Sequence, residues 1–386
     1  AEKLGVRLLL AGSVVEANDR IRLSVRLDDP FTGRSIWGTE IERPAGTILS
    51  ARAEIASLLA VRLSLAAPAP VANDARQLNP EAQDAFIRGI VELNAAPAPR
   101  LKSALTLFEL ASQREPGWAE PLAYLAHVRQ IAGEFGNPNG REERAEEIRT
   151  DALRALGLGG ARPMGYFALA SVQAFHDWDL RAAEDTLRQS IEAFPRDANA
   201  RSRLALLLAA QGRVQEAVVE AEGAREAEPL IAERYTTLGI VRYYARDYSR
   251  ALQDMQQALR VAPNYAPALF GSGRIKTATG NHDEAIRDIQ AAIASSPTYN
   301  PGWMAGLAIA YAAAGRGDGV ADAVGKLDVL QRQGTFVGVG NFAYISAYQG
   351  RMDEAFGFLE EAVNRRMTMG LWLAVVPWGD PLRPHP

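Results

Sequence analysis

The sequence predicts a mostly α-helical protein, a superhelix of about eight antiparallel helix pairs preceded by a small, incomplete α+β module. Three observations predict this class. Prolines recur at 34-residue intervals, at Pro195, Pro229, Pro263 and Pro297. Residues 1–66 instead show the two-residue alternation that is typical of strands. The 386 residues are 48% hydrophobic and 23% charged, which favours a folded chain over a disordered one.

The first predicted domain, residues 1–66, should contain a three-stranded antiparallel meander and a helix. In "RIRLSVRL" (20–27) apolar and polar side chains alternate, as in a half-buried strand. "VRLLLAGSVVEA" before it and "RSIWGTEIER" after it predict further strands, joined by polar turns. A helix is expected at 47–63. The three consecutive leucines at 8–10 predict a strand buried on both faces, so we expect elements before Ala1 to be missing.

Residues 67–80 are rich in alanine and proline and predict a semi-rigid linker. Helix pairs are then expected over 81–368, followed by a C-terminal tail at 369–386. Between Pro116 and Pro163 the spacing grows to 47 residues, so we expect a longer loop at 133–147.

Two further positions repeat with the prolines. Twelve residues before each proline stands an alanine, and twenty-four before it stands a small residue: Ser171, Ala205, Gly239 and Gly273. Small residues allow the two helices of a pair to cross closely, and proline ends the second helix. Because one pair cannot bury its apolar faces alone, neighbouring pairs are expected to stack.

This pattern resembles the tetratricopeptide repeat (TPR), which the stretch 235–263 shows most fully. It carries, in that family's spacing, Leu238, Gly239, Tyr248, Ala251, Ala258 and Pro263. Residues 4–49, followed by "NPEAQDAFIRGI", resemble the α+β module related to the TolB amino-terminal domain. That module precedes TPR arrays in bacterial winged-helix transcriptional regulators and class III adenylate cyclases. The resemblance implies a regulatory region whose effector domain lies upstream of this chain.

The sequence contains none of the common catalytic or metal-binding patterns. The absence of cysteine excludes disulfides, thiol catalysis and cysteine-based metal sites. No histidine pair with zinc spacing, phosphate-binding glycine loop or nucleophile elbow occurs, so we expect no enzyme activity, no cofactor and no metal. The net charge of −4 argues against direct nucleic-acid binding. No apolar run is long enough to span a membrane. The sequence does not decide whether the protein is located in the bacterial cytoplasm or periplasm. It also leaves open the oligomeric state and whether an upstream segment tethers the chain.

In TPR arrays the first helix of each pair lines a concave groove. Counting each unit back from its proline, positions 2, 5, 9, 12 and 13 should face that groove. The predicted partner-binding residues are Phe175, His176, Thr236, Ile240, Tyr243, Tyr244, Phe270, Arg274, Thr277, Tyr344 and Tyr348. Asn199, Ser202 and Leu206 occupy the same positions of a further unit. The alternative interpretation is that the aromatic residues only complete the packing between repeats.

The tyrosine pair at 243–244 is displaced from its usual place in the family. The TPR pattern carries paired tyrosines at positions 11 and 12, whereas here Arg242 takes position 11. The pair is therefore turned by about 100°, which should direct Tyr244 toward the groove. With Phe270 and Arg274 it forms a predicted hot spot. Of the positions that clamp a peptide's terminal carboxylate in other TPR proteins, only Arg274 is basic, so that binding mode is not expected.

Two functions are compatible with this sequence. The first is a non-enzymatic protein–protein interaction scaffold, the regulatory region of a bacterial signalling or transcription-regulating protein. The second is a small-ligand sensor that controls an upstream cyclase or DNA-binding domain. An open, continuous groove would favour the scaffold, and a compact apolar pocket with converging polar groups would favour the sensor.

Overall fold

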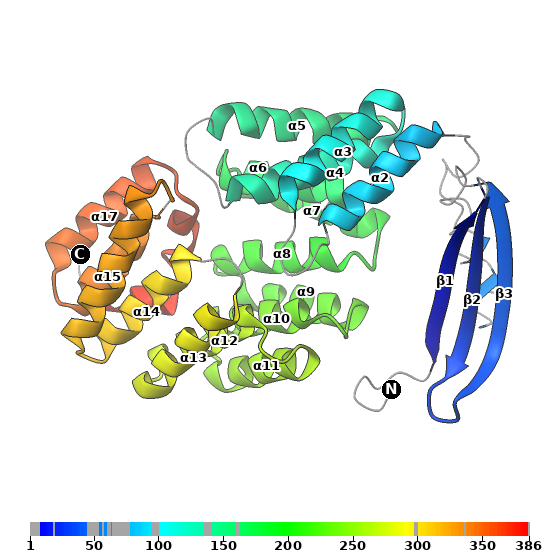
Figure 1. Cartoon of the computed structure of the whole chain (residues 1–386). Helices are drawn as coiled ribbons and strands as arrows, with labels where there is room; N and C mark the ends of the chain where they lie inside the picture. The colour runs from blue at the N-terminus through cyan, green and yellow to red at the C-terminus, as the bar shows by residue number, and fades with distance from the viewer. Residues whose placement is uncertain are drawn as a thin grey trace. The chain divides into compact units, whose positions relative to one another are not determined.

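The computed structural model describes residues 8–17, 20–44, 54–55, 58–59, 63, 78–93, 100–134, 141–159, 163–296, 300–335 and 337–384 (Figure 1). The chain divides into two compact units. Unit 1 comprises residues 1–128 with 154–162, and unit 2 comprises residues 129–153 with 163–386. The predicted helix at 47–63 lies largely outside the described residues, and so does the predicted linker up to residue 77.

The strands of unit 1 form a three-stranded antiparallel sheet in the order β1 (Leu9–Ala17), β2 (Arg20–Asp29), β3 (Arg34–Pro44). Ile21 and Leu23 of β2 are buried against Ile41 of β3, which confirms the predicted alternation. β1 pairs only with β2, and its Leu9 and Leu10 are 45% and 51% exposed. Among the described residues neither leucine is buried, so the burial of this strand on both faces stays a prediction.

The helices of unit 1 pack around aromatic rings. They are α2 (Pro80–Leu93), α3 (Leu101–Arg114) and the first part of α4 (Ala119–Glu134). The fully buried ring of Phe108 lies 5.6 Å from that of Phe86 and 5.3 Å from that of Tyr124. Gly89 makes room for it, since a Cβ there would lie 2.6 Å from the Phe108 ring.

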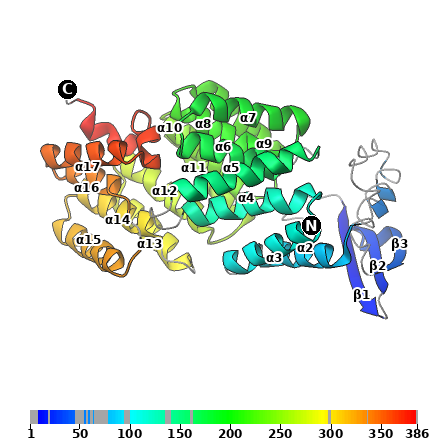
Figure 2. The ribbon, with the colours of Figure 1, turned by 90° about the horizontal axis from the view of Figure 1, so that it is seen from above.

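Unit 2 is a stack of antiparallel helix pairs, seen from above in Figure 2. We name the first helix of each pair the A helix and the second the B helix. The pairs, A helix first, are α6 (Pro163–Phe175) with α7 (Leu180–Ala193), α8 (Ala198–Ala210) with α9 (Val214–Ala227), α10 (Ala232–Tyr244) with α11 (Tyr248–Val261), α12 (Ala266–Ala278) with α13 (His282–Ser295), α14 (Pro301–Ala313) with α15 (Gly317–Arg332), and α16 (Gly340–Tyr348) with α17 (Met352–Asn364). The predicted fold class is confirmed.

Small residues lie where the two helices of a pair cross, as the repeat predicts. A Cβ on Gly239 of α10 would lie 2.8 Å from Met255 Cε on α11. A Cβ on Gly273 of α12 would lie 2.4 Å from Ile289 Cγ1 on α13. Protein interiors are packed too densely to absorb such overlaps without movement. The small residue therefore sets how closely the helices of a pair approach.

The repeat prolines follow the B helices. α7, α9 and α11 end two residues before Pro195, Pro229 and Pro263. In each case the N–H of the intervening cap residue donates to the carbonyl four residues earlier. Proline has no N–H with which to continue this ladder, so the helix ends there. Pro297 lies outside the described residues.

The expected loop at 133–147 is wrong over its second half, because α5 (Arg141–Gly157) begins at Arg141. Glu142 and Glu143 lie in the first turn, where the helix dipole favours negative charge. Arg149 Nε lies 3.2 Å from Glu146 Oε2, three residues earlier. These charges stabilise a helix that the irregular proline spacing did not predict.

After α17 the chain forms two short 3-10 helices, η3 (Thr368–Trp372) and η4 (Pro377–Leu382). Pro377 and Pro381 lack the N–H groups that an α-helical ladder needs. The predicted C-terminal tail thus contains local turns and no further helix pair in its described residues.

Candidate partner-binding face

The A helices of unit 2 lie side by side. From α6 to α16, each A helix contacts the next more closely than successive B helices contact one another. Closer spacing on one side makes a stack of helix pairs curve toward that side. We call the surface formed by the A helices the inner face.

Arg274 of α12 lies among four aromatic rings. Its guanidinium carbon is 4.9 Å from the ring centre of Tyr243 and 5.9 Å from that of Tyr244, both on α10. The ring of Phe270 lies at 6.0 Å, and that of Trp378 in η4 at 4.9 Å. These distances are within the range of cation–π attraction. The structure thus brings together the four residues of the predicted hot spot.

Arg274 differs from other shielded arginines of unit 2 in lacking an acidic partner. Arg242 pairs with Asp254 at 2.7 Å, and Arg234 pairs with Glu228 at 2.8 Å. Arg274 forms no ion pair with any carboxylate of the described residues, and its buried Nε has no hydrogen-bond partner. A shielded cation without an acid is costly unless other groups stabilise it. Here the aromatic rings do so: burial would lower the pKa of Arg274, but Tyr244 and Tyr243 beside it raise that pKa.

Tyr243 supports this cluster from inside the unit. Its side chain is only 1% exposed, and its hydroxyl has no hydrogen-bond partner. Burial raises the pKa of Tyr243 far above its usual value. In this conformation Tyr243 can act on a partner only through Arg274, whereas the neighbouring Tyr244 is only partly buried.

The remaining predicted residues of α10, α12 and α16 belong mainly to the packing. Thr236 and Thr277 are buried, and their hydroxyls donate to carbonyl oxygens four residues earlier, at 3.1 and 2.9 Å. Tyr344 is also buried, while Ile240 and Tyr348 pack, partly buried, against the same apolar cluster. In this conformation these side chains stabilise the repeats and offer a partner few free polar groups.

Phe175 and His176, at the end of α6, have different surroundings. The ring of Phe175 lies on the inner face, 5.1 Å from the guanidinium carbon of Arg203. His176 Nδ1 lies 2.9 Å from Asp177 Oδ1, and its Nε2 lies 3.0 Å from Glu142 Oε2. The structure therefore does not bring His176 together with the aromatic residues.

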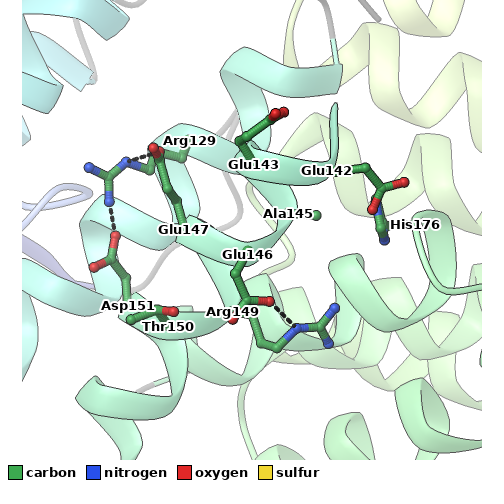
Figure 3. A pocket seen from close by; sticks show the side chains of 10 residues that line it. All are labelled: Arg129, Glu142, Glu143, Ala145, Glu146, Glu147, Arg149, Thr150, Asp151 and His176. Carbon is green, nitrogen blue, oxygen red and sulfur yellow. Dashed lines mark hydrogen bonds and ion pairs between the residues drawn. The ribbon is translucent and has the colours of Figure 1, made fainter. Parts of the chain in front are cut away.

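His176 borders an open acidic depression of about 640 Å³ over α5 (Figure 3). Its acidic lining residues are Glu142, Glu143, Glu146, Glu147 and Asp151. Arg129 pairs with Asp151 and, at 3.4 Å, with Glu147, so part of this charge is compensated. Within the described part of the chain, no group of three or more His, Asp or Glu side chains could hold a metal ion.

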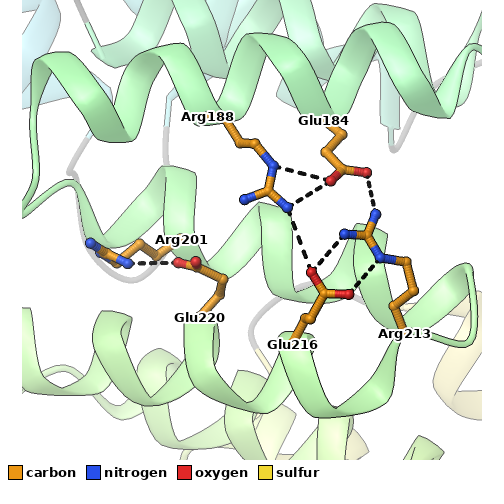
Figure 4. Close-up of polar contacts among 6 residues, drawn as sticks. All are labelled: Glu184, Arg188, Arg201, Arg213, Glu216 and Glu220. Atoms are coloured by element: carbon orange, nitrogen blue, oxygen red, sulfur yellow. Dashed lines mark hydrogen bonds and ion pairs between the residues drawn. The ribbon is translucent and has the colours of Figure 1, made fainter.

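An ion-pair network connects the B helices of two neighbouring pairs (Figure 4). Glu184 of α7 lies 2.7 Å from both Arg188 and Arg213, and Arg213 lies 2.6 Å from Glu216 of α9. The hydrogen bond from Arg213 lowers the pKa of Glu216. Burial alone would raise the pKa of Glu184, but its bonds from the two arginines outweigh burial and lower it. The network stabilises the stacking of repeats.

Two tryptophans on the inner face were missed by sequence reasoning. Trp372 stacks on Tyr244, with ring centres 5.6 Å apart and planes at 23°. Trp378 meets Phe270 edge-on at 6.0 Å. Both follow the last repeat, where the 34-residue pattern makes no prediction. The only available signal was the presence of two large aromatic side chains in a tail rich in glycine and proline.

The fold and this face define the class of the protein, an α-helical repeat protein built from stacked helix pairs. The family model of the tetratricopeptide repeat matches residues 179–229 and 236–301, which extend from α7 into α14. These residues are therefore similar to tetratricopeptide repeats.

Similar proteins were found among both curated sequences and solved structures. Putative adenylate cyclase 3 of Rhizobium meliloti (strain 1021) is 27% identical over 177 residues, which are 44% of this chain and 30% of that protein. The match thus spans less than a third of the relative's length. A tetratricopeptide repeat protein from Parabacteroides merdae ATCC 43184 is 15% identical, with a TM-score of 0.43 over 78% of this chain and 100% of that one. YrrB, a TPR protein with an unusual peptide-binding site, is 20% identical, with a TM-score of 0.33 over 49% of this chain and 89% of its own.

Proposed function

We propose that this chain is a non-enzymatic interaction scaffold that binds a peptide or protein partner on the inner face of unit 2. The observation that carries the proposal is the cluster around Arg274, with Tyr244 and Phe270 beside it on adjacent A helices. Tyrosine and arginine are enriched among the residues that dominate binding energy at interfaces. A cation beside partly buried rings offers both polar and apolar contacts to a peptide segment.

The partner-binding region is proposed to regulate a bacterial signalling or transcription-regulating protein. The similarity of 44% of the chain to a putative adenylate cyclase supports this context. In this proposal residues 1–66 form the α+β module, 67–80 the linker, 81–368 the solenoid and 369–386 the tail. The net charge of −4 disfavours direct contact with nucleic acid. In the described part of the chain, no helix combines the length and the apolar character needed to span a bilayer.

Small-ligand sensing has less support from the cavities of unit 2. The apolar cavity beside Phe175 and Trp372 holds about 10 Å³, room for a single water molecule. The acidic depression at His176 is large but open to solvent. A metabolite site normally combines an enclosed apolar pocket with a few converging polar groups. Partner binding therefore ranks first.

The proposal is tested by partner recovery from a native lysate on the immobilised chain. The test variant is Tyr244→Ala/Arg274→Ala, and the matched control is Gln256→Ala/Arg260→Ala on the exposed side of α11. Loss of two hot-spot side chains should lower recovery by at least about tenfold. Circular dichroism checks that each variant stays folded. Equal recovery of every partner on wild type, variant and control would reject the proposal.

A further inference from the structure

The C-terminal segment, residues 368–384, lies along the inner face of unit 2. Its contacts follow the order of the A helices. Trp372 borders α6, α8 and α10, Trp378 borders α12 and α14, and η4 contacts α16. One segment of the chain thus occupies the surface on which the predicted partner-binding residues lie.

The inner face has a shaped site for each of the two indoles. Trp372 stacks on Tyr244 and borders an apolar cavity of about 10 Å³. Trp378 is 5% exposed and lies against both Phe270 and Arg274. Gly306 of α14 leaves space for both rings, since a Cβ there would lie 2.5 Å from the Phe270 ring and 3.0 Å from the Trp378 ring. The C-terminal segment therefore fits the inner face mainly through its two tryptophan side chains.

The polar contacts of the segment are weak by comparison. The buried Nε1 of Trp378 has no hydrogen-bond partner, and neither has the hydroxyl of Tyr243. Asp380 pairs with Arg246 at 2.6 Å, but these side chains are 48% and 37% exposed. Exposed ion pairs contribute little, and unmet buried polar groups oppose binding. A partner that supplied the missing polar contacts would bind this surface better than the segment does.

The segment has the form of a tethered peptide. It consists of two 3-10 turns and adds no helix pair to the stack. Arg383 holds the bend between the turns by donating to the carbonyl oxygens of Ala374 and Val376, each at 3.0 Å. Its connection to α17 keeps it at a high effective concentration over the inner face. A free peptide of equal intrinsic affinity would therefore bind poorly while the segment is in place.

We propose that the inner face takes a peptide segment with two large aromatic side chains about six residues apart and a carboxylate just beyond the second, the spacing of Trp372, Trp378 and Asp380. Residues 368–384 cover this surface until a partner peptide of that chemistry displaces them. The inference rests on the proposed function and names the partner chemistry and the regulation of the same face.

The test measures binding of a fluorescein-labelled synthetic peptide with the sequence of residues 368–384 to the full chain. Fluorescence anisotropy compares wild type with Trp372→Ala/Trp378→Ala, which weakens the internal competitor. We expect the variant to bind the peptide at least about tenfold more tightly than wild type. Adding Tyr244→Ala/Arg274→Ala should remove that binding. Pro384→Ala, at an exposed position of the segment, should behave as wild type. Absence of peptide binding to a folded tail variant would overturn the inference.

Hydrogen exchange of the wild-type chain gives an independent readout if the tail variant does not fold. Saturating peptide should speed exchange of the amides at 370–383, and unchanged exchange would overturn the inference. The two proposals can fail separately. A lysate partner that depends on Tyr244 and Arg274 but is recovered equally by wild type and tail variant would leave the proposed function intact. It would reject only control by the C-terminal segment.

Discussion

Replacement of Gly273 by alanine tests whether the small repeat position sets the packing of a helix pair. The added Cβ would lie 2.4 Å from Ile289 Cγ1 and 3.0 Å from the carbonyl oxygen of Ala285. Carbon atoms in normal contact are about 3.5–4.0 Å apart, so α12 and α13 would have to separate by roughly 1 Å. Ile289 is fully buried and cannot swing into solvent.

The expected cost follows from two opposing effects. Overpacking a well-packed core destabilises by about 1–3 kcal/mol, and a contact with backbone belongs at the upper end of that range. Alanine improves intrinsic helix propensity over glycine by about 1 kcal/mol. The net loss for Gly273→Ala is therefore roughly 2 kcal/mol. The same change at Gly325 in α15 meets no atom within 4 Å and should stabilise, by about 1 kcal/mol.

Urea unfolding followed by far-ultraviolet circular dichroism compares the two variants with wild type. The midpoint should fall for Gly273→Ala and rise for Gly325→Ala, with little change in the slope of the transition. The opposite signs separate packing from helix propensity, because both changes add the same methyl group to a helix. A midpoint for Gly273→Ala at or above that of wild type would refute the close crossing of α12 and α13.

Two further predictions concern unit 1 and the ion-pair network. Phe108→Ala removes a fully buried ring and should cost about 3–5 kcal/mol in urea unfolding, whereas Leu110→Ala at a 38% exposed position of the same helix should cost far less; similar losses would contradict the aromatic core of unit 1. The lowered pKa of Glu216 and of Glu184 means that their ion pairs stabilise the fold above the ordinary value of 4.5 and lose this effect as pH falls below it. Arg213→Gln should therefore lower the melting temperature at pH 7 and by a smaller amount at pH 4, and a deficit independent of pH would contradict this role.

The repeat architecture could be predicted from the sequence because it depends on single residues at fixed positions of each unit. Pro195 ends a helix through its missing N–H, and Gly273 permits a close crossing, whatever the rest of the chain does. The strand alternation around Ile21 and Leu23 is local in the same way. Such features recur at a fixed period, so each unit reinforces the assignment of the next.

The orientation of individual side chains was harder to predict. Positions counted from the repeat proline place Thr236 and Thr277 toward the groove, but both are buried and bonded to their own helix. A threonine hydroxyl can donate its hydrogen bond to the carbonyl oxygen four residues earlier, so a polar residue type does not by itself mark a binding surface. α5 was missed because its stabilising charge pairs carry no repeat signature.

The C-terminal segment could not be predicted, because its contacts join residues more than a hundred positions apart, such as Tyr244 and Trp372. That contact changes the meaning of the displaced tyrosine pair. With the pair shifted by one position, the Tyr243 ring contacts the guanidinium of Arg274. The Tyr244 ring stacks on the indole of Trp372, which lies outside the repeats. If the aromatic residues only completed packing between repeats, their contacts would come from neighbouring A and B helices. Tyr244 and Arg274 also contact Trp372 and Trp378, which lie outside the repeats. These contacts favour a surface shaped for a bound segment.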